Sequence, residues 1–214
     1  MTSRRSARIA GENLTTDMSA ETLEPGDIVL SYRRQYKGPF KYLVTRLILF
    51  FTTAWWKGES TSKVYHAEMV VKSLSDKEFQ VVTMEPMKCR YKTRSYNRKR
   101  ILRLNLKGPF FNNAFEQYVQ EKFGQKYDYL KLIQIILYWM FLGWNWLGRI
   151  YKNSDRDICS EFVARFYERV GIVCSTVDAD ITTPDDIYDM TSHAIFYKVV
   201  FDAKGDYGKQ TSMG

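Results

Sequence analysis

The chain has few of the residues on which several common functions depend. Its 214 residues include three cysteines and two histidines, too few and too scattered for the ligand spacing of a zinc site or the framework of a disulfide-rich domain. The twelve glycines form no phosphate-binding loop. Five prolines and 15% aromatic residues exclude a collagen-like or low-complexity chain. We therefore expect an ordinary globular core, no metal site and no cofactor.

Long apolar segments are also missing. The longest uncharged segment, residues 132–148, has 17 residues, whereas a membrane-spanning helix needs about 20, and Gln134 and Asn145 interrupt it. Two interpretations stay open, namely a buried or cleft-lining helix and a membrane-contacting segment. In either case Trp139 and Trp144 are candidates for an apolar substrate groove. No apolar leader follows the N-terminus, so we expect a cytoplasmic protein, with peripheral contact to a membrane as an option.

Basic residues exceed acidic ones, by 32 to 24, which gives a formal net charge of +8. One segment, residues 88–103, holds eight basic residues and no acidic one. It is interpreted either as a solvated strand surface or as a site for an anionic partner, such as an anionic membrane. Only Tyr91 and Tyr96 are aromatic there, and no base-reading motif is present, so the sequence disfavours nucleic acid.

The pattern along the chain predicts an α+β fold in a single domain at residues 23–203, between flexible tails at 1–22 and 204–214. Strands are expected at 28–30, 64–72, 78–85, 101–106 and 194–202, helices at 40–53, 112–123 and 159–170, and a turn or helix start at 183–186. The strands at 64–72 and 78–85 are separated by a short polar turn and should form an antiparallel hairpin.

Cys159 opens the predicted helix 159–170, where the helix dipole and a neighbouring imidazolium would both favour the thiolate. Cys89 and Cys174 have no comparable surroundings. His66 lies in a strand and shares a face with Glu68, while Glu85 ends the neighbouring strand and could orient the imidazole. His193 is the alternative base, and it would serve if the base followed the nucleophile in the chain.

These residues lie in segments whose order is found in a known family. In chain order the segments are Leu23-Glu24-Pro25-Gly26-Asp27-Ile28-Val29, Val64-Tyr65-His66-Ala67, a strand ending in Glu85-Pro86, Gly124-Gln125-Lys126-Tyr127-Asp128-Tyr129, Ile158-Cys159-Ser160-Glu161-Phe162-Val163 and Thr183-Pro184-Asp185-Asp186. Together they resemble the permuted papain-like amidases and peptidases of the NlpC/P60 superfamily. The resemblance spans about residues 23 to 190, nearly the whole ordered part predicted above.

The resemblance implies a circularly permuted papain-like fold and a cysteine amidase that acts on a peptide-like bond. It implies Cys159 as the nucleophile, His66 as the base and Glu85 as the orienting residue, with a thioester as the acyl-enzyme. The backbone N–H of Cys159 is a candidate oxyanion donor, and Tyr127 is a candidate for the substrate groove.

Two other functions stay open. One is a lipid-directed thiol acyl hydrolase or acyltransferase at a membrane surface, which the apolar segments would suit. The other is a non-catalytic protein that binds anionic partners through residues 88–103.

Overall fold

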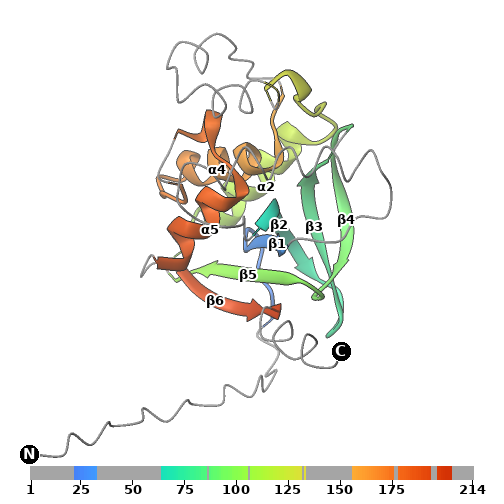
Figure 1. The fold of residues 1–214 in the computed structure, drawn as a ribbon. Coiled ribbons are helices and arrows are strands. Elements are labelled where there is room, and N and C mark those ends of the chain that lie inside the picture. The colour runs from blue at the N-terminus through green and yellow to red at the C-terminus, as the bar shows by residue number, and fades with distance from the viewer. Residues whose placement is uncertain are drawn as a thin grey trace, which may run out of the picture.

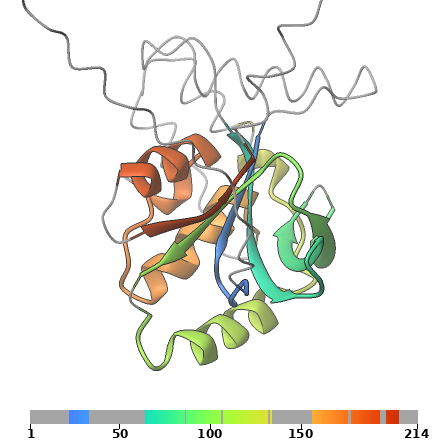
Figure 2. The ribbon, with the colours of Figure 1, turned by 90° about the horizontal axis from the view of Figure 1, so that it is seen from below.

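A computed structural model of the chain describes residues 22–32, 64–85, 87–105, 107–131, 133, 156–175, 178–193 and 197–203. These residues form an α+β structure in which six antiparallel strands have the order β4-β3-β2-β1-β5-β6. The strands are β1 (Ile28–Tyr32), β2 (Val64–Ser73), β3 (Glu78–Met84), β4 (Cys89–Ser95), β5 (Lys99–Leu104) and β6 (Tyr197–Asp202). The helices are α2 (Phe111–Lys122), α4 (Cys159–Arg169), the short 3₁₀ helix η3 (Ala179–Ile181) and α5 (Pro184–His193), and α2, α4 and α5 lie on one side of the sheet (Figures 1 and 2).

Most of the elements expected from the sequence are confirmed within a few residues. The hairpin β2–β3 pairs Val70 with Val81, and α4 spans residues 159–169. Gly171 follows α4 with a φ of 75°, a left-handed conformation that glycine adopts without strain and that commonly ends helices. The predicted helix at 40–53 and nearly all of residues 132–148, including Trp139 and Trp144, lie outside the described residues. In the described part of the chain no helix is long and apolar enough to cross a membrane.

The sequence analysis left a solvated strand surface open for residues 88–103 but gave no bounds for a strand there, and the structure has β4 at Cys89–Ser95. Arg90, Lys92 and Arg94 occupy every second position of β4 and share one face of the sheet with Thr83 and Val81, their neighbours on β3. The side chains of the basic run are therefore held in a regular array at the edge of the sheet.

The main core lies between the sheet and the helices. Ile28, Met69 and Leu102 from the sheet pack in one cluster with Phe162 and Phe166 of α4, and all five are fully buried. Burying each such side chain contributes about 1.5–3 kcal/mol. This packing fixes α4, and with it Cys159, against the sheet.

The opposite face of the sheet has a smaller apolar cluster and is strongly curled. The ring of Tyr96, in the turn between β4 and β5, lies 4.9 Å from Phe79 on β3 and 5.1 Å from Phe201 on β6. Strands from both halves of the sheet therefore approach one another across this face. Along β2, Val70 belongs to this cluster, and Glu68 and His66 follow on the same face towards the start of the strand.

Candidate active site

The first residue of α4 is Cys159, which is 8% exposed. The preceding Ile158 is extended, with φ −96° and ψ 170°, and its backbone N–H donates to the Glu161 carboxylate at 3.4 Å. This reciprocal contact of an N3 glutamate is half of a capping box and fixes where the helix begins. The thiol therefore lies at the positive end of the helix dipole, which favours a thiolate.

The Cys159 thiol forms a hydrogen bond with the His66 side chain. Burial by itself raises the pKa of Cys159, but the charge and hydrogen bond of His66 and the backbone N–H groups of Ala67 and Ser160 outweigh it and lower this pKa. Burial lowers the pKa of His66, but the charges of Cys159 and Glu68 outweigh it and raise this pKa to about 10. Both shifts favour a thiolate–imidazolium pair at neutral pH.

A bulge in the sheet accompanies this contact. The register between β1 and β2 shifts between Ser31 and Tyr32, where Ser31 pairs with His66 and Tyr32 with Val64. Bulges are common beside active sites, where they redirect a side chain. The register shift therefore lies next to His66, whose imidazole contacts Cys159 at the start of α4.

The other side of the imidazole contacts Glu68 and Thr83. His66 Nε2 lies 3.2 Å from Glu68 Oε1 and 2.9 Å from Thr83 Oγ1. These contacts leave Nδ1 as the ring nitrogen available to the thiol. Glu68 is fully buried; burial raises its pKa, but His66, Lys99 and Arg94 outweigh burial and hold the pKa of Glu68 well below its usual range.

Two cations fix the Glu68 carboxylate. Arg94 Nε donates to Glu68 Oε1 at 3.0 Å, and Lys99 Nζ lies 3.1 Å from Glu68 Oε2. Lys99 Nζ also donates to Ser31 Oγ on β1. Glu68 is thus tied to β4, β5 and β1 through its partners, which holds its carboxylate against the imidazole.

Glu85 does not make the contact that the sequence analysis assigned to it. Its oxygens contact Arg90 at 2.6 Å, Arg94 at 2.7 Å and Lys92. It stays near the imidazole, since single ligand atoms of His66, Glu68 and Glu85 lie within 4.8 Å of one another. Of the two carboxylates, Glu68 is the one that contacts the ring directly. The sequence signal for Glu68 is its position two residues after His66 on the same strand face.

The grouping of one histidine and two carboxylates has the residue types of a metal site. Here, however, both carboxylates are already neutralised by Arg90, Lys92, Arg94 and Lys99. A divalent cation would have to displace these side chains and withstand their repulsion. The donor set therefore fits an ion-pair cluster better than a metal centre.

Tyr127 lies beside the thiol. The residue is 9% exposed, and burial and the charge of Cys159 raise the pKa of its phenol well above the usual value. The backbone of Tyr127 bridges Asp157, two residues before Cys159, which brings the two segments together. The rings of Tyr127 and Tyr129 lie 5.2 Å apart, and the next apolar side chains, Leu130 and Ile133, are exposed. Trp139 and Trp144, the other candidates for the substrate groove, lie outside the described residues.

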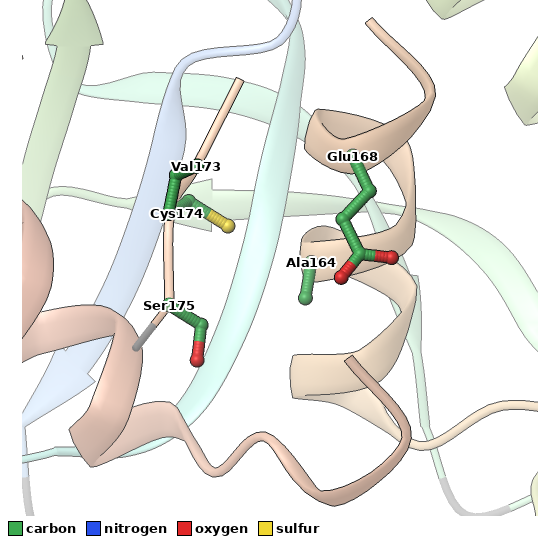
Figure 3. Close-up of a pocket in the computed structure, with 5 residues that line it drawn as sticks. All are labelled: Ala164, Glu168, Val173, Cys174 and Ser175. Atoms are coloured by element: carbon green, nitrogen blue, oxygen red, sulfur yellow. The ribbon is translucent and has the colours of Figure 1, made fainter. Parts of the chain in front are cut away.

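The other two thiols are buried in surroundings that disfavour a thiolate. Burial raises the pKa of both Cys89 and Cys174 to about 12. Cys174 lines a cavity of about 60 Å³ near the C-terminal end of α4 (Figure 3). The residues that line the cavity are Ala164, Glu168, Val173, Cys174 and Ser175, none of which contributes to the cluster around Cys159. His193 ends α5, and its side chain lies outside the described residues.

A second buried ion network supports the start of α4. Lys131 Nζ contacts Glu161 and lies 3.2 Å from Asp180, and Arg165 lies 2.7 Å from each of these carboxylates. Burial, together with the charge of Asp157, raises the pKa of Glu161 to about 8. The network joins the segment after Tyr127 to α4 and η3, so it keeps the tyrosine and the thiol together.

Most of the basic run at 88–103 is engaged inside the protein. Six of its eight basic residues form ion pairs: Arg90, Lys92, Arg94, Lys99, Arg100 and Arg103. Exposed ion pairs contribute little, but pairs to buried carboxylates such as Glu68 are strongly constrained. The run therefore has a structural role in the cluster as well as a positive surface.

No protein-family model matches the chain, and no curated protein matches it with significant similarity.

Proposed function

We propose that the protein is a cysteine hydrolase that acts on an amide, peptide-like bond through a thioester acyl-enzyme. The single observation that carries the proposal is the hydrogen bond between Cys159, at the N-terminus of α4, and His66 on β2, with the lowered pKa of the thiol. The histidine precedes the cysteine in the chain and a sheet presents it to the helix. This arrangement supports a circularly permuted papain-like fold.

In the proposed reaction, the Cys159 thiolate attacks the carbonyl carbon and forms a tetrahedral intermediate. The protonated His66 then gives its proton to the leaving amine, the carbon–nitrogen bond breaks, and a thioester on Cys159 remains. Neutral His66 next takes a proton from water, whose oxygen attacks the thioester carbonyl; the carbon–sulfur bond then breaks, the carboxylic acid is released, and the thiolate and the imidazolium are restored. The backbone N–H of Cys159 is our candidate donor to the oxyanion.

Glu68 is the residue we propose to orient the imidazole. Its carboxylate is fully buried and 3.2 Å from His66 Nε2, so it favours the imidazolium and keeps Nδ1 directed to the sulfur. Glu85 then acts indirectly: it binds Arg94, and Arg94 contacts Glu68. This assignment differs from the family resemblance, which implies Glu85 for the orienting role.

The proposal is tested by trapping the acyl-enzyme. A p-nitrophenyl ester is mixed with the protein at pH 5, where deacylation is slow, and the intact mass is measured. We expect one acyl adduct on Cys159, released by hydroxylamine as a thioester would be, and no adduct in Cys159→Ala. Cys174→Ala is the matched control and should acylate normally. An adduct that persists in Cys159→Ala would contradict the proposal.

A second candidate is a lipid-directed thiol acyl hydrolase or acyltransferase. The observation that favours it is the exposed apolar group Tyr129, Leu130 and Ile133, which follows Tyr127 directly. The chemistry at Cys159 would be the same, with an ester in place of the amide. Cosedimentation with phosphatidylcholine vesicles, with and without anionic lipid, separates it from the first candidate.

The non-catalytic alternative has less support. A protein that binds anionic partners along the whole of residues 88–103 would need most of the eight basic side chains free, whereas six of them are engaged in ion pairs.

A further inference from the structure

The two carboxylates next to His66 face more cations than they can neutralise. Glu68 and Glu85 are contacted by four cationic side chains: Arg90, Lys92, Arg94 and Lys99. The Cys159–His66 pair adds no net charge, because moving the proton between the two groups leaves the sum unchanged. Among the described residues, this cluster therefore carries an excess of two positive charges beside the His66 imidazole.

Two of the four cations can accept a further partner. The side chains of Arg90 and Lys92 are 39% and 31% exposed, whereas that of Lys99 is 11% exposed. A guanidinium has five N–H donors, and in the described part of the chain Arg90 uses only Nη2, towards Glu85. Its Nε is buried without a hydrogen-bond partner among the described residues. An arginine with unused donors is well suited to hold a carboxylate or a phosphate.

These cations lie close to the imidazole that contacts the thiol. An oxygen of Glu85 lies within 4.8 Å of a ring nitrogen of His66, and Arg90 Nη2 lies 2.6 Å from Glu85 Oε2. The guanidinium is therefore within about one Debye length, ~10 Å at 0.1 M salt, of the imidazole. A negative group a few bonds from a carbonyl held at Cys159 would feel both charges with little screening.

We propose that Arg90 and Lys92 bind an anionic group, a carboxylate or a phosphate, on the acyl substrate of Cys159. The protein then prefers substrates with a negative charge a few bonds from the scissile carbonyl. This inference rests on the proposed function, since it takes Cys159 as the reacting group.

The test compares two alkylating reagents of similar size and different charge, iodoacetate and iodoacetamide. The ratio of their rates at Cys159, divided by the same ratio for N-acetylcysteine, measures the attraction of the site for a carboxylate. Each charge removed should lower this ratio about 5-fold in a partly screened site. We expect a fall of about 10-fold or more in Arg90→Gln/Lys92→Gln. The charge-matched control Lys72→Gln/Lys77→Gln, at the far end of the β2–β3 hairpin where both lysines are exposed, should stay within 2-fold.

A variant that removes a negative charge instead of positive ones tests the proposal if the double variant does not fold. Glu85→Gln removes a negative charge from the cluster, so the normalised ratio should rise. An unchanged or lower ratio in Glu85→Gln, or a similar fall in the double variant and its control, would overturn the inference. The iodoacetamide rate alone reports activation of Cys159, so failure of the proposed function is recognised separately.

Competition identifies the anion. Glutarate and inorganic phosphate are each added during alkylation by iodoacetamide. Stronger protection of Cys159 by glutarate indicates a carboxylate on the substrate, and stronger protection by phosphate indicates a phosphate. In both cases Arg90→Gln/Lys92→Gln should lose the protection. Protection by neither anion, or protection that survives in the double variant, would refute the proposed site.

Discussion

The replacement of Glu68 by glutamine separates the two carboxylates that could orient His66. Glu68→Gln and Glu85→Gln each remove one negative charge and one partner of Arg94 while keeping the side-chain size. Of these two carboxylates, Glu68 is the one that contacts the imidazole, with Oε1 3.2 Å from Nε2. A difference between the two variants in the alkylation rate of Cys159 therefore reports the contact with the ring, because both variants remove the same charge from the cluster.

The magnitude follows from the distance. Two charges 3.2 Å apart interact with about 5 kcal/mol in an effective dielectric of 20. Because Arg94 and Lys99 share the Glu68 carboxylate, we expect about 2 kcal/mol of this to stabilise the imidazolium. A loss of that size lowers the pKa of His66 by about 1 to 1.5 units and weakens the thiolate–imidazolium pair by up to ~30-fold.

The assay is the pH profile of Cys159 alkylation by iodoacetamide. The ion pair exists between the lowered pKa of Cys159 and the raised pKa of His66, about 10, so the wild-type rate should stay nearly flat from mildly acidic to basic pH. In Glu68→Gln the neutral thiol–imidazole pair should compete with the ion pair, so the plateau should fall to about one tenth of the wild-type rate or less, and the upper pH limit of the ion pair should move to lower pH. Glu85→Gln should stay within about 3-fold. The opposite ranking would return the orienting role to Glu85 and refute the assignment of Glu68.

The remaining predictions concern the thiols, the base, the acid stability and one turn. Iodoacetamide at pH 6 should label Cys159 before Cys89 and Cys174, whose pKa values burial raises to about 12; earlier labelling of either would remove the basis for the nucleophile. His66→Ala should reduce acylation of Cys159 about 100-fold or more, while His193→Ala should keep at least about a third of it, and the reverse result would overturn the permuted order. The hydrogen bonds and charges of their cationic partners outweigh burial and lower the pKa of Glu85 and of Asp180 to about 2, so both carboxylates stabilise the fold above the ordinary carboxyl pKa. This stability should be lost as the pH falls from about 5 to about 2, and thermal unfolding of Asp180→Asn should show a smaller decline over that range than wild type. Gly26→Ala should destabilise the protein by about 2–4 kcal/mol in urea unfolding, because Gly26 has a φ of 80° and an added Cβ would lie 2.6 Å from the Phe111 ring, and an unchanged midpoint would contradict that packing.

Local patterns were enough to predict much of the fold. Alternation identified the hairpin of β2 and β3, and the apolar stripe ahead of Gly171 identified α4 with Cys159 at its start. The candidate nucleophile and base could be proposed because only three cysteines and two histidines had to be considered. Their hydrogen bond depends on how α4 packs against β2, which no local pattern contains.

The lack of bounds for β4 and the choice between Glu68 and Glu85 as the third residue of the site have one physical origin. The β2–β3 register, continued to the strand ends, puts Glu85 directly across from His66, so on the hairpin alone Glu85 is the reasonable partner. What changes this is β4, because its cations Arg90, Lys92 and Arg94 lie on the same sheet face and bind the Glu85 carboxylate. A strand whose alternate positions are charged looks like surface in a sequence, unless the carboxylates that it neutralises are known. Glu68, fully buried, requires the same kind of compensation from Arg94 and Lys99, since a buried carboxylate without partners would be protonated or would destabilise the fold. The basic run and the candidate catalytic residues are thus parts of one electrostatic unit, and its excess of positive charge leads to the preference for an anionic substrate.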